Sequence, residues 1–218
     1  MPQISAIEPQ KRNKDRFNVF LDGHFAFGIS ASLLFENQLK VGKVLEEEEI
    51  VKILQKEELS KLTDQVLHFL SYRPRSEKEI TDYLIKKIAA KENIKYHQAK
   101  NSPLVAQIIE KLKRYKYIND LEFAKWFISS RIKSKPKGVR LLKLELFKKG
   151  IDKNIAEIVL PKNLNQKELA KKAIEKKIKK WQKLPPLELK KKVYSYLAGR
   201  GFNWEIIQEI VAILIKKR

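Results

Sequence analysis

The chain has 218 residues, with 47 lysines and arginines against 26 aspartates and glutamates, which gives a formal charge of +21. Because 43% of the residues are hydrophobic, the chain is not a disordered basic tail. The absence of cysteine excludes disulfides, thiolate zinc sites and cysteine nucleophiles. No stretch approaches the roughly 20 apolar residues that span a bilayer, and the N-terminus lacks a secretory pattern. We therefore expect a cytoplasmic protein without a membrane partner.

The positive charge is confined to one part of the chain. Residues 1–59 hold eight basic and ten acidic residues, whereas residues 60–218 hold 39 basic and 16 acidic residues. A folded region with such an excess favours a polyanion, usually nucleic acid, as its partner. An ordinary lysine-rich solvated surface is the alternative, but the uneven distribution of charge favours the polyanion.

The first segment, residues 1–59, is predicted to be a small β-hairpin and helix region. Two β-rich runs, 17–21 and 24–29, flank Asp22-Gly23, the dipeptide typical of a type I′ turn. A lone hairpin is marginal in water, and residues 4–7 are the candidate third strand.

Two helices are expected to follow this hairpin. Ser30 is placed to cap a short helix that runs through Phe35. A further helical stretch begins near Glu46, the first of four successive glutamates. The helix dipole favours negative charge in a first turn, so a helix start explains this run better than a metal site does.

From about residue 60 the pattern is helical and it repeats. The pattern is a helix that ends at a glycine, followed by one apolar residue and an Asp or Asn that caps the next helix. It occurs at Gly150–Asp152 and again 51 residues later at Gly201–Asn203. Such self-similarity predicts tandem three-helix modules that each lean on a neighbour. The fold class is therefore mainly α, with three tandem three-helix modules in a curved array after the small β-hairpin plus helix domain. We expect the modules at 60–118 (with an insertion at 89–101), 119–162 and 163–218.

Caps and prolines place the helices of these modules. Cap-x-x-Glu capping boxes begin at Ser76, Asn119 and Asn165, and Pro161 and the pair Pro185-Pro186 separate helices. The expected helices span 63–72, 76–88, 103–116, 120–133, 137–149, 152–160, 166–182, 186–200 and 204–216.

The sequence lacks the patterns of a catalytic site. His24, His68 and His97 are scattered, and there is no glycine-rich phosphate loop. Asp120 and Glu122 are an acidic pair of the kind that nuclease metal sites use, but helix initiation explains them better. We predict a protein that is not an enzyme and needs no cofactor or metal.

Basic residues gather where the first helix of a module turns into the second. Backbone N–H groups at a helix N-terminus beside Arg or Lys can bind phosphate, although ordinary solvation of a turn is the alternative. Repetition at one structural position favours a functional role. The third module carries a comparable lysine cluster at 176–183. The candidate contact residues are Arg73, Arg75, Arg131, Lys133, Lys135, Lys137 and Arg140, with Lys149, Lys180 and Arg200 as weaker additions.

Three tryptophans lie among these basic clusters and could stack on unpaired bases. Helical spacing beside apolar residues favours a core position for Trp126 and Trp204. The lysine-rich surroundings of Trp181 leave both roles open.

Three motifs resemble, in their order and spacing, the RecX family of regulatory proteins. They are Phe69–Ile80, Tyr117–Ala124 and, after Arg131, Glu145–Ile151. The resemblance runs from about residue 60 to about 214, and the hairpin around Leu21-Asp22-Gly23 resembles the extra domain of longer members. Two features depart from the family pattern: Lys116 stands where the family often has glycine, and the insertion 89–101 lengthens the first module.

The resemblance implies a non-enzymatic regulator of recombination, DNA repair and the SOS response. Members of the family lodge in the groove of the RecA–DNA filament and suppress or tune its ATPase, strand-exchange and co-protease activities, and many bind DNA directly. The expected partners are therefore the RecA filament and single- or double-stranded DNA, and the chain is expected to be a monomer. An autonomous DNA-binding helical-repeat protein without a recombinase partner is the alternative, and a nuclease is the less favoured one.

Overall fold

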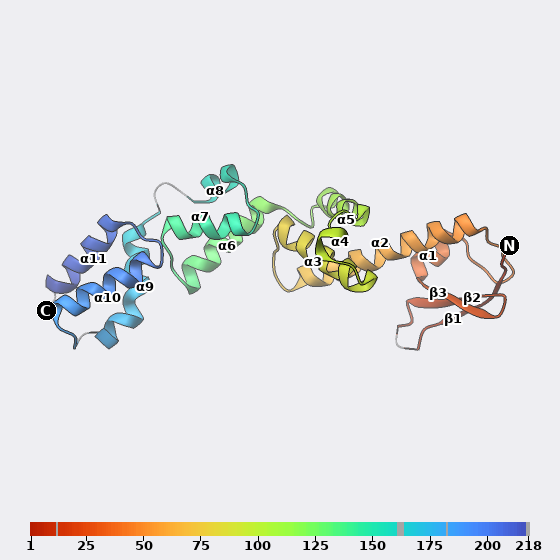
Figure 1. The fold of residues 1–218 in the computed structure, drawn as a ribbon, viewed down its shortest axis with the longest axis horizontal. Helices are drawn as coiled ribbons and strands as arrows, with labels where there is room; N and C mark the ends of the chain where they lie inside the picture. Colours follow the sequence, from red (N-terminus) through yellow and green to blue (C-terminus); the bar gives the residue numbers. More distant parts are fainter. Residues whose placement is uncertain (12, 161–163, 182, 217–218) are drawn as a thin grey trace. The chain divides into compact units, whose positions relative to one another are not determined.

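The computed structural model describes residues 1–11, 13–160, 164–181 and 183–216. Along this described chain a three-stranded antiparallel sheet is followed by eleven helices (Figure 1). The chain forms two compact units, Met1–Ser71 with Ser102–Ile108 and Tyr72–Asn101 with Ile109–Arg218. The expected class, mainly helical after a small N-terminal β region, is confirmed.

The sheet of the first unit is a simple meander of β1 (Ile4–Pro9), β2 (Arg16–Leu21) and β3 (His24–Ser30). Asp22 and Gly23 join β2 to β3 with φ angles of 50° and 84°. Positive φ at both central residues is what a type I′ turn requires, and this turn matches the twist of the paired strands. The predicted hairpin and third strand are both confirmed.

Two helices share a hydrophobic core with this sheet. They are α1 (Ala31–Glu36), capped by the Ser30 hydroxyl, and α2 (Glu47–Ser71), which begins with three glutamates in its first turn. Leu33 of α1 and Ile53 of α2 are buried with side chains from all three strands. The expected helix starts are therefore confirmed.

A buried carboxylate ties α2 to the strands. Glu57 is only 7% exposed. It accepts hydrogen bonds from the guanidinium of Arg16 and, at 3.0 Å, from the backbone N–H of Ser30. A buried charge is tolerated only when it is paired and hydrogen-bonded, and Glu57 meets both conditions.

Helix α2 is one continuous helix of 25 residues. The prediction of a separate helix that starts at residue 63 is wrong, and the boundary expected after residue 59 falls inside α2. Neither glycine nor proline occurs between residues 47 and 71, so nothing local ends the helix.

The insertion predicted at residues 89–101 is largely helical. Helix α3 (Glu77–Glu92) continues into it and ends at Asn93, which takes a left-handed φ of 53°. A single turn, α4 (Tyr96–Ala99), follows, and Pro103 then opens α5 (Pro103–Arg114). The sequence predicts the start of α5 but gives no signal for α4.

The remaining helices form two successive groups of three, each with its own core (Figure 1). Leu142 and Leu146 are buried in the first of these cores, and Val193 and Leu197, 51 residues later, are buried in the second. The predicted repeat is therefore confirmed at the level of packing. The bounds are α6 (Asp120–Ser134), α7 (Val139–Lys148), α8 (Lys153–Val159), α9 (Gln166–Trp181), α10 (Pro186–Ala198) and α11 (Trp204–Lys216).

The glycine after the second helix of a module packs against the preceding module. Gly150 and Gly201 take φ angles of 82° and 79°, which L side chains rarely adopt. A Cβ atom added to Gly150 would lie 2.5 Å from Cβ of Lys78 in α3, and one added to Gly201 would lie 2.5 Å from Cβ of Leu141 in α7. The same close approach therefore forms both junctions between modules.

Candidate functional site

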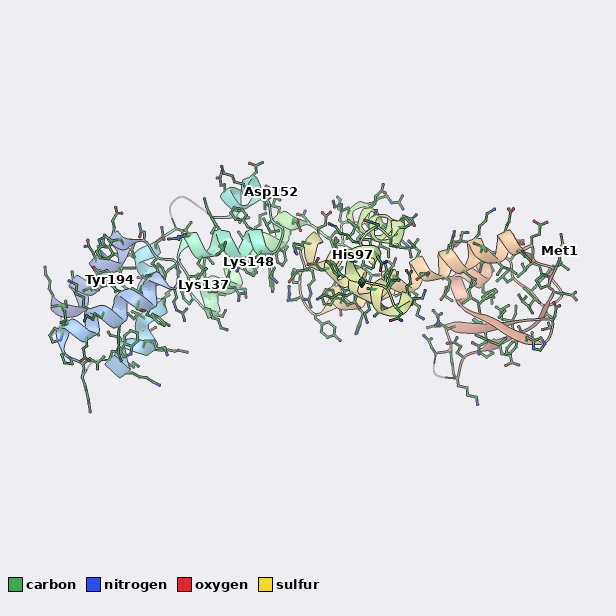
Figure 2. All side chains as sticks on the ribbon, viewed as in Figure 1. Met1, His97, Lys137, Lys148, Asp152 and Tyr194 are labelled. Atoms are coloured by element: carbon green, nitrogen blue, oxygen red, sulfur yellow. The ribbon has the colours of Figure 1, made fainter. Side chains whose placement is uncertain are left out.

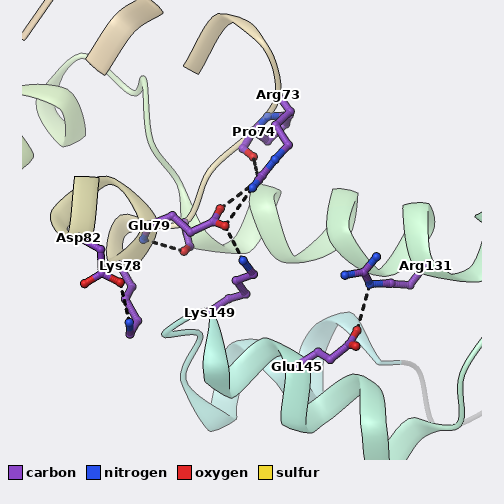
Figure 3. A network of polar contacts seen from close by, with 9 residues as sticks. Arg73, Pro74, Lys78, Glu79, Asp82, Arg131, Glu145 and Lys149 are labelled. Atoms are coloured by element: carbon purple, nitrogen blue, oxygen red, sulfur yellow. Dashed lines mark hydrogen bonds and ion pairs between the residues drawn. The ribbon is translucent and has the colours of Figure 1, made fainter. Parts of the chain in front are cut away.

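Glu79 is the centre of a polar network that joins the first and second modules (Figure 3). The two terminal nitrogens of Arg73 donate hydrogen bonds to its two carboxylate oxygens at 3.0 and 2.9 Å. Nζ of Lys149, at the end of α7, donates to the same carboxylate at 2.5 Å. The Arg73 guanidinium also lies 5.6 Å from the ring centre of Trp126 in α6, a cation–π distance. Two predicted contact residues, Arg73 and Lys149, are thus engaged within the chain.

The protonation state of Glu79 follows from these contacts. Burial acts to raise the pKa of the carboxyl group, but the hydrogen bonds from Arg73 and Lys149 and their positive charges outweigh it and lower the pKa to about 2. Glu79 therefore carries its charge throughout the neutral range and holds both cations. A capping box at Ser76 is only half formed, because the Ser76 hydroxyl accepts from the Glu79 N–H at 3.2 Å while the Glu79 side chain turns to the cations.

The N-terminus of α3 is bound by the next module. The carboxylate of Asp120, the first residue of α6, accepts from the backbone N–H of Glu77 at 2.8 Å. Burial raises the pKa of Asp120, opposed by that hydrogen bond. Two N–H groups in the first turn of α3, those of Glu77 and Glu79, are therefore bonded within the chain. The phosphate site that the sequence predicts at this turn is not open at those two groups.

Arg75 lies half-buried in the same turn. Burial, together with the neighbouring positive charge of Arg73, lowers its pKa below the ordinary arginine value. The guanidinium groups of Arg73 and Arg75 therefore lie close together near the Glu79 carboxylate, and they are not two cations freely exposed to solvent.

The second module repeats the arrangement around Glu145 of α7. Nε of Arg131, near the end of α6, donates to Glu145 at 3.0 Å (Figure 3), and Lys137 donates to the other oxygen. The Arg131 guanidinium lies 4.7 Å from the ring centre of Phe127. As in the first module, an arginine at the turn pairs with a glutamate of the second helix and packs on an aromatic ring of α6.

Arg200 holds the junction between the second and third modules. Its Nη1 donates to the backbone oxygen of Pro136 at 3.3 Å, and its backbone oxygen accepts from the N–H of Gly138 at 2.9 Å. Its guanidinium lies 4.5 Å from the ring centre of Tyr196. Arg200 occupies the position that Lys149 occupies 51 residues earlier, immediately before the junction glycine. Both residues therefore connect a module to the one before it.

Four of the predicted contact residues are free to meet a partner. Lys133, Lys135, Arg140 and Lys180 are exposed, and none of their side chains forms an ion pair or hydrogen bond with the part of the chain that the structure describes. The first three flank the turn between α6 and α7, whereas Lys180 lies near the end of α9. The structure thus brings three free cations to one turn and leaves the fourth in another module.

An open pocket of about 420 Å³ lies beside this turn, between α7 and the end of α10. Arg140 lines it together with two apolar side chains, Leu144 and Phe147, which are 48% and 45% exposed. Neighbouring cationic and apolar groups of this kind are typical of surfaces that contact other macromolecules.

The tryptophans differ in their burial. Trp126 is half-buried against the core of the second module, as predicted. Trp181 packs edge-to-face on Tyr196 at 5.6 Å between ring centres. The prediction of a core position for Trp204 is wrong: this residue is 61% exposed, because the first turn of α11 directs Ile207 into the core instead.

Sequence reasoning missed the two glutamates that organise the turns. From the sequence, Glu79 was assigned to a capping box and Glu145 to a motif of the family resemblance, and neither was assigned a contact with a basic side chain. A signal was present, since each of the first two modules places a glutamate in its second helix and an arginine at or just after the end of its first. Only the fold shows that these side chains meet.

No group of three or more histidine, aspartate and glutamate side chains within residues 1–11, 13–160, 164–181 and 183–216 could hold a metal ion. Over the same residues, no helix is both long and apolar enough to cross a bilayer.

A small β domain followed by tandem three-helix modules with a basic surface defines a class of helical-repeat proteins. Family models for this class match four successive parts of the chain. The Regulatory protein RecX N-terminal domain matches residues 2–46, and the first, second and third RecX three-helix domains match residues 64–94, 119–160 and 165–211. The chain belongs to the RecX family of regulatory proteins.

Individual relatives agree with this assignment. Regulatory protein RecX of Bacillus pumilus is 39% identical over 212 residues, which are 96% of this chain and 76% of that protein. The Bacillus subtilis protein of the same name is 38% identical over 95% of this chain and 75% of its own length. A crystal structure of regulatory protein RecX superposes with a TM-score of 0.67 at 28% identity, covering 95% of this chain and 98% of that one. RecX from Lactobacillus salivarius gives a TM-score of 0.55 at 30% identity over 72% of this chain and 96% of that one.

Proposed function

We propose that this protein is a cytoplasmic, non-enzymatic regulator of homologous recombination and DNA repair that binds the RecA–DNA filament and modulates its ATPase, strand-exchange and co-protease activities. Its action is steric and allosteric: it bridges neighbouring recombinase subunits, and it blocks filament growth or disfavours the active state. Membership of a family named for regulation supports the proposal, as does the concentration of positive charge in residues 60–218.

The observation that carries the proposal is the surface beside the turn between α6 and α7. Lys133, Lys135 and Arg140 flank this turn without an ion pair among the described residues, and Arg140 also lines a pocket with exposed Leu144 and Phe147. A nucleoprotein filament presents DNA phosphates and protein surface side by side. Cations suit the phosphates and steer association, and exposed apolar groups suit the protein. A protein that binds DNA through its phosphates alone does not need the apolar part.

An autonomous DNA-binding protein is the second candidate, because the net charge of +21 would by itself support binding to DNA. The two candidates differ in what they require. The autonomous binder needs charge alone, whereas the filament regulator needs the shape and apolar contacts of the same surface.

The free cations provide a direct test. Replacing Lys133, Lys135 and Arg140 together with alanine is expected to weaken binding to DNA and to RecA–DNA filaments roughly tenfold or more at low salt. The slope of log affinity against log salt should fall by about 2 to 3, since each cation that contacts a phosphate contributes about 0.7 to 0.9. Fluorescence anisotropy over a salt series measures both, and circular dichroism should show unchanged helicity.

The matched control is the triple variant Lys40→Ala, Lys52→Ala and Lys61→Ala. These exposed lysines belong to the first unit, and replacing them removes the same amount of charge as the test variant. Equal weakening by both triple variants would show that net charge alone matters and would contradict the assigned surface. Arg73 and Lys137 are unsuitable for this test, because their removal breaks the ion pairs of Glu79 and Glu145.

A further inference from the structure

The third module carries a pair of neighbouring aromatic rings, of which Tyr194 is half-buried against the core and Trp204 is exposed. Tyr194 lies on α10 (Figure 2) and Trp204 opens α11, and their ring centres are 4.6 Å apart with an interplanar angle of 37°. Trp204 is 61% exposed, so the pair presents an aromatic face to solvent. Large exposed aromatic surface lowers solubility and stability unless a partner covers it.

The repeat shows that the module architecture does not require these rings. The residues 51 positions before Tyr194 and Trp204 are Lys143 and Lys153. In the second module these two lysines occupy the equivalent places on α7 and at the start of α8, while the buried positions on either side stay apolar in both modules. The module architecture therefore accepts lysine at both sites, and while Tyr194 packs partly against the core of the third module, the exposed ring of Trp204 is not required by the fold.

Positive charge lies on the same face of α10. Lys190 and Lys191 precede Tyr194 by four and three residues, a spacing that places side chains together on one side of a helix. Both are exposed, and neither has an ion-pair partner within the described ranges. One acidic residue, Glu205, follows Trp204, in the first helical turn where the helix dipole stabilises it.

We propose that Tyr194 and Trp204 form a stacking platform for an unpaired base of single-stranded DNA, with Lys190 and Lys191 holding the adjacent phosphates. Sequence-independent binding of single strands combines two components: aromatic rings on which bases stack, and cations that follow the DNA phosphates. A base in a duplex is already stacked and cannot reach the platform without leaving its pair. The site therefore selects single-stranded over double-stranded DNA. This inference rests on the proposed function, since it names which DNA the regulator holds.

The test uses the full chain with Trp126→Phe and Trp181→Phe, so that Trp204 is the sole tryptophan. Single-stranded oligothymidylate should quench its fluorescence, and a duplex at equal phosphate concentration should leave the fluorescence nearly unchanged. Trp204→Ala in the wild-type background should weaken oligothymidylate binding roughly 5- to 100-fold and duplex binding less than about twofold. Trp204→Phe should retain most of the affinity. Oligothymidylate that binds by anisotropy without quenching, or equal quenching by both DNAs, would overturn the proposal.

A sharper variant exploits the repeat. Tyr194→Lys with Trp204→Lys installs the residues that the second module carries, so the fold should tolerate them. Electrostatics alone would strengthen binding to both kinds of DNA, because two positive charges are added. Stacking predicts the opposite for oligothymidylate, with weaker binding and lost preference for single strands. A gain in single-strand affinity would overturn the platform.

Its failure and that of the proposed function are distinguishable. If oligothymidylate does not quench Trp204 while the wild-type protein still alters RecA turnover, only the stacking site is contradicted. If RecA without DNA quenches Trp204, the aromatic pair is a protein-docking face instead. Wild-type protein that leaves RecA turnover unchanged removes the regulatory function, whatever Trp204 reports.

Discussion

Gly138→Ala is expected to destabilise the contact between the second and third modules by about 2–4 kcal/mol. The added Cβ would overlap the backbone oxygen of Gly201 and lie 2.6 Å from the backbone nitrogen of Phe202. These are backbone atoms that cannot turn aside, so one module must move. The hydrogen bond from the Gly138 N–H to the Arg200 oxygen, 2.9 Å long, would then lengthen or break.

Urea unfolding and amide hydrogen exchange measure this effect. The variant should unfold at lower urea, and exchange at Gly138 should accelerate. Gly199→Ala is the control, because Gly199 has an ordinary helical φ of −61° and its added Cβ would lie 3.2 Å from the Ser195 oxygen and 3.8 Å from the Tyr196 oxygen. Its effect should stay within about 0.5 kcal/mol. If both variants unfold at the same urea concentration, the close junction does not exist.

Glu79→Gln is expected to lower stability by about 1.5–3 kcal/mol at pH 7, because it leaves Arg73 and Lys149 without their shared carboxylate. The effect depends on pH with a definite sign. The pKa of Glu79 is lowered to about 2 in the folded protein, and an unfolded glutamate titrates near 4.3. The stabilisation is therefore complete above about pH 5 and is lost as the pH falls toward 2.

Thermal unfolding of the wild type and the variant between pH 7 and pH 2 tests this prediction. The difference in stability should be constant down to about pH 5 and should shrink below it. Glu122→Gln is a suitable control, since Glu122 is exposed and pairs only with Lys125 within its own helix, among the described residues. A difference between the wild type and Glu79→Gln that does not change with pH would show that the carboxylate charge is not what holds the junction.

Local signals in the sequence predicted most of the secondary structure. Asp22-Gly23 fixed the hairpin because positive φ at two successive residues is a local requirement. Gly150 and Gly201 marked helix ends and the repeat for the same reason. The prediction divided the long helix α2 wrongly. The excess of basic residues begins near residue 60, but no glycine or proline interrupts the helix there.

The candidate site was less predictable, because its contacts join residues distant in sequence. Lys149 and Glu79 are 70 residues apart, and nothing near either one indicates the pairing. Asp120 was expected to begin its own helix, and it also caps α3 in the preceding module. The exposure of Trp204 likewise follows from the rotation of α11 on its neighbours rather than from local spacing.

The central proposal is that the protein regulates a RecA filament, and ATP turnover tests it most directly. A filament preassembled on single-stranded DNA would be titrated with this protein, with DNA in excess of what free protein could sequester. Turnover should fall at well below one protein per recombinase subunit, because each bound molecule bridges subunits and blocks or destabilises the filament. Unchanged turnover up to stoichiometric amounts would contradict it.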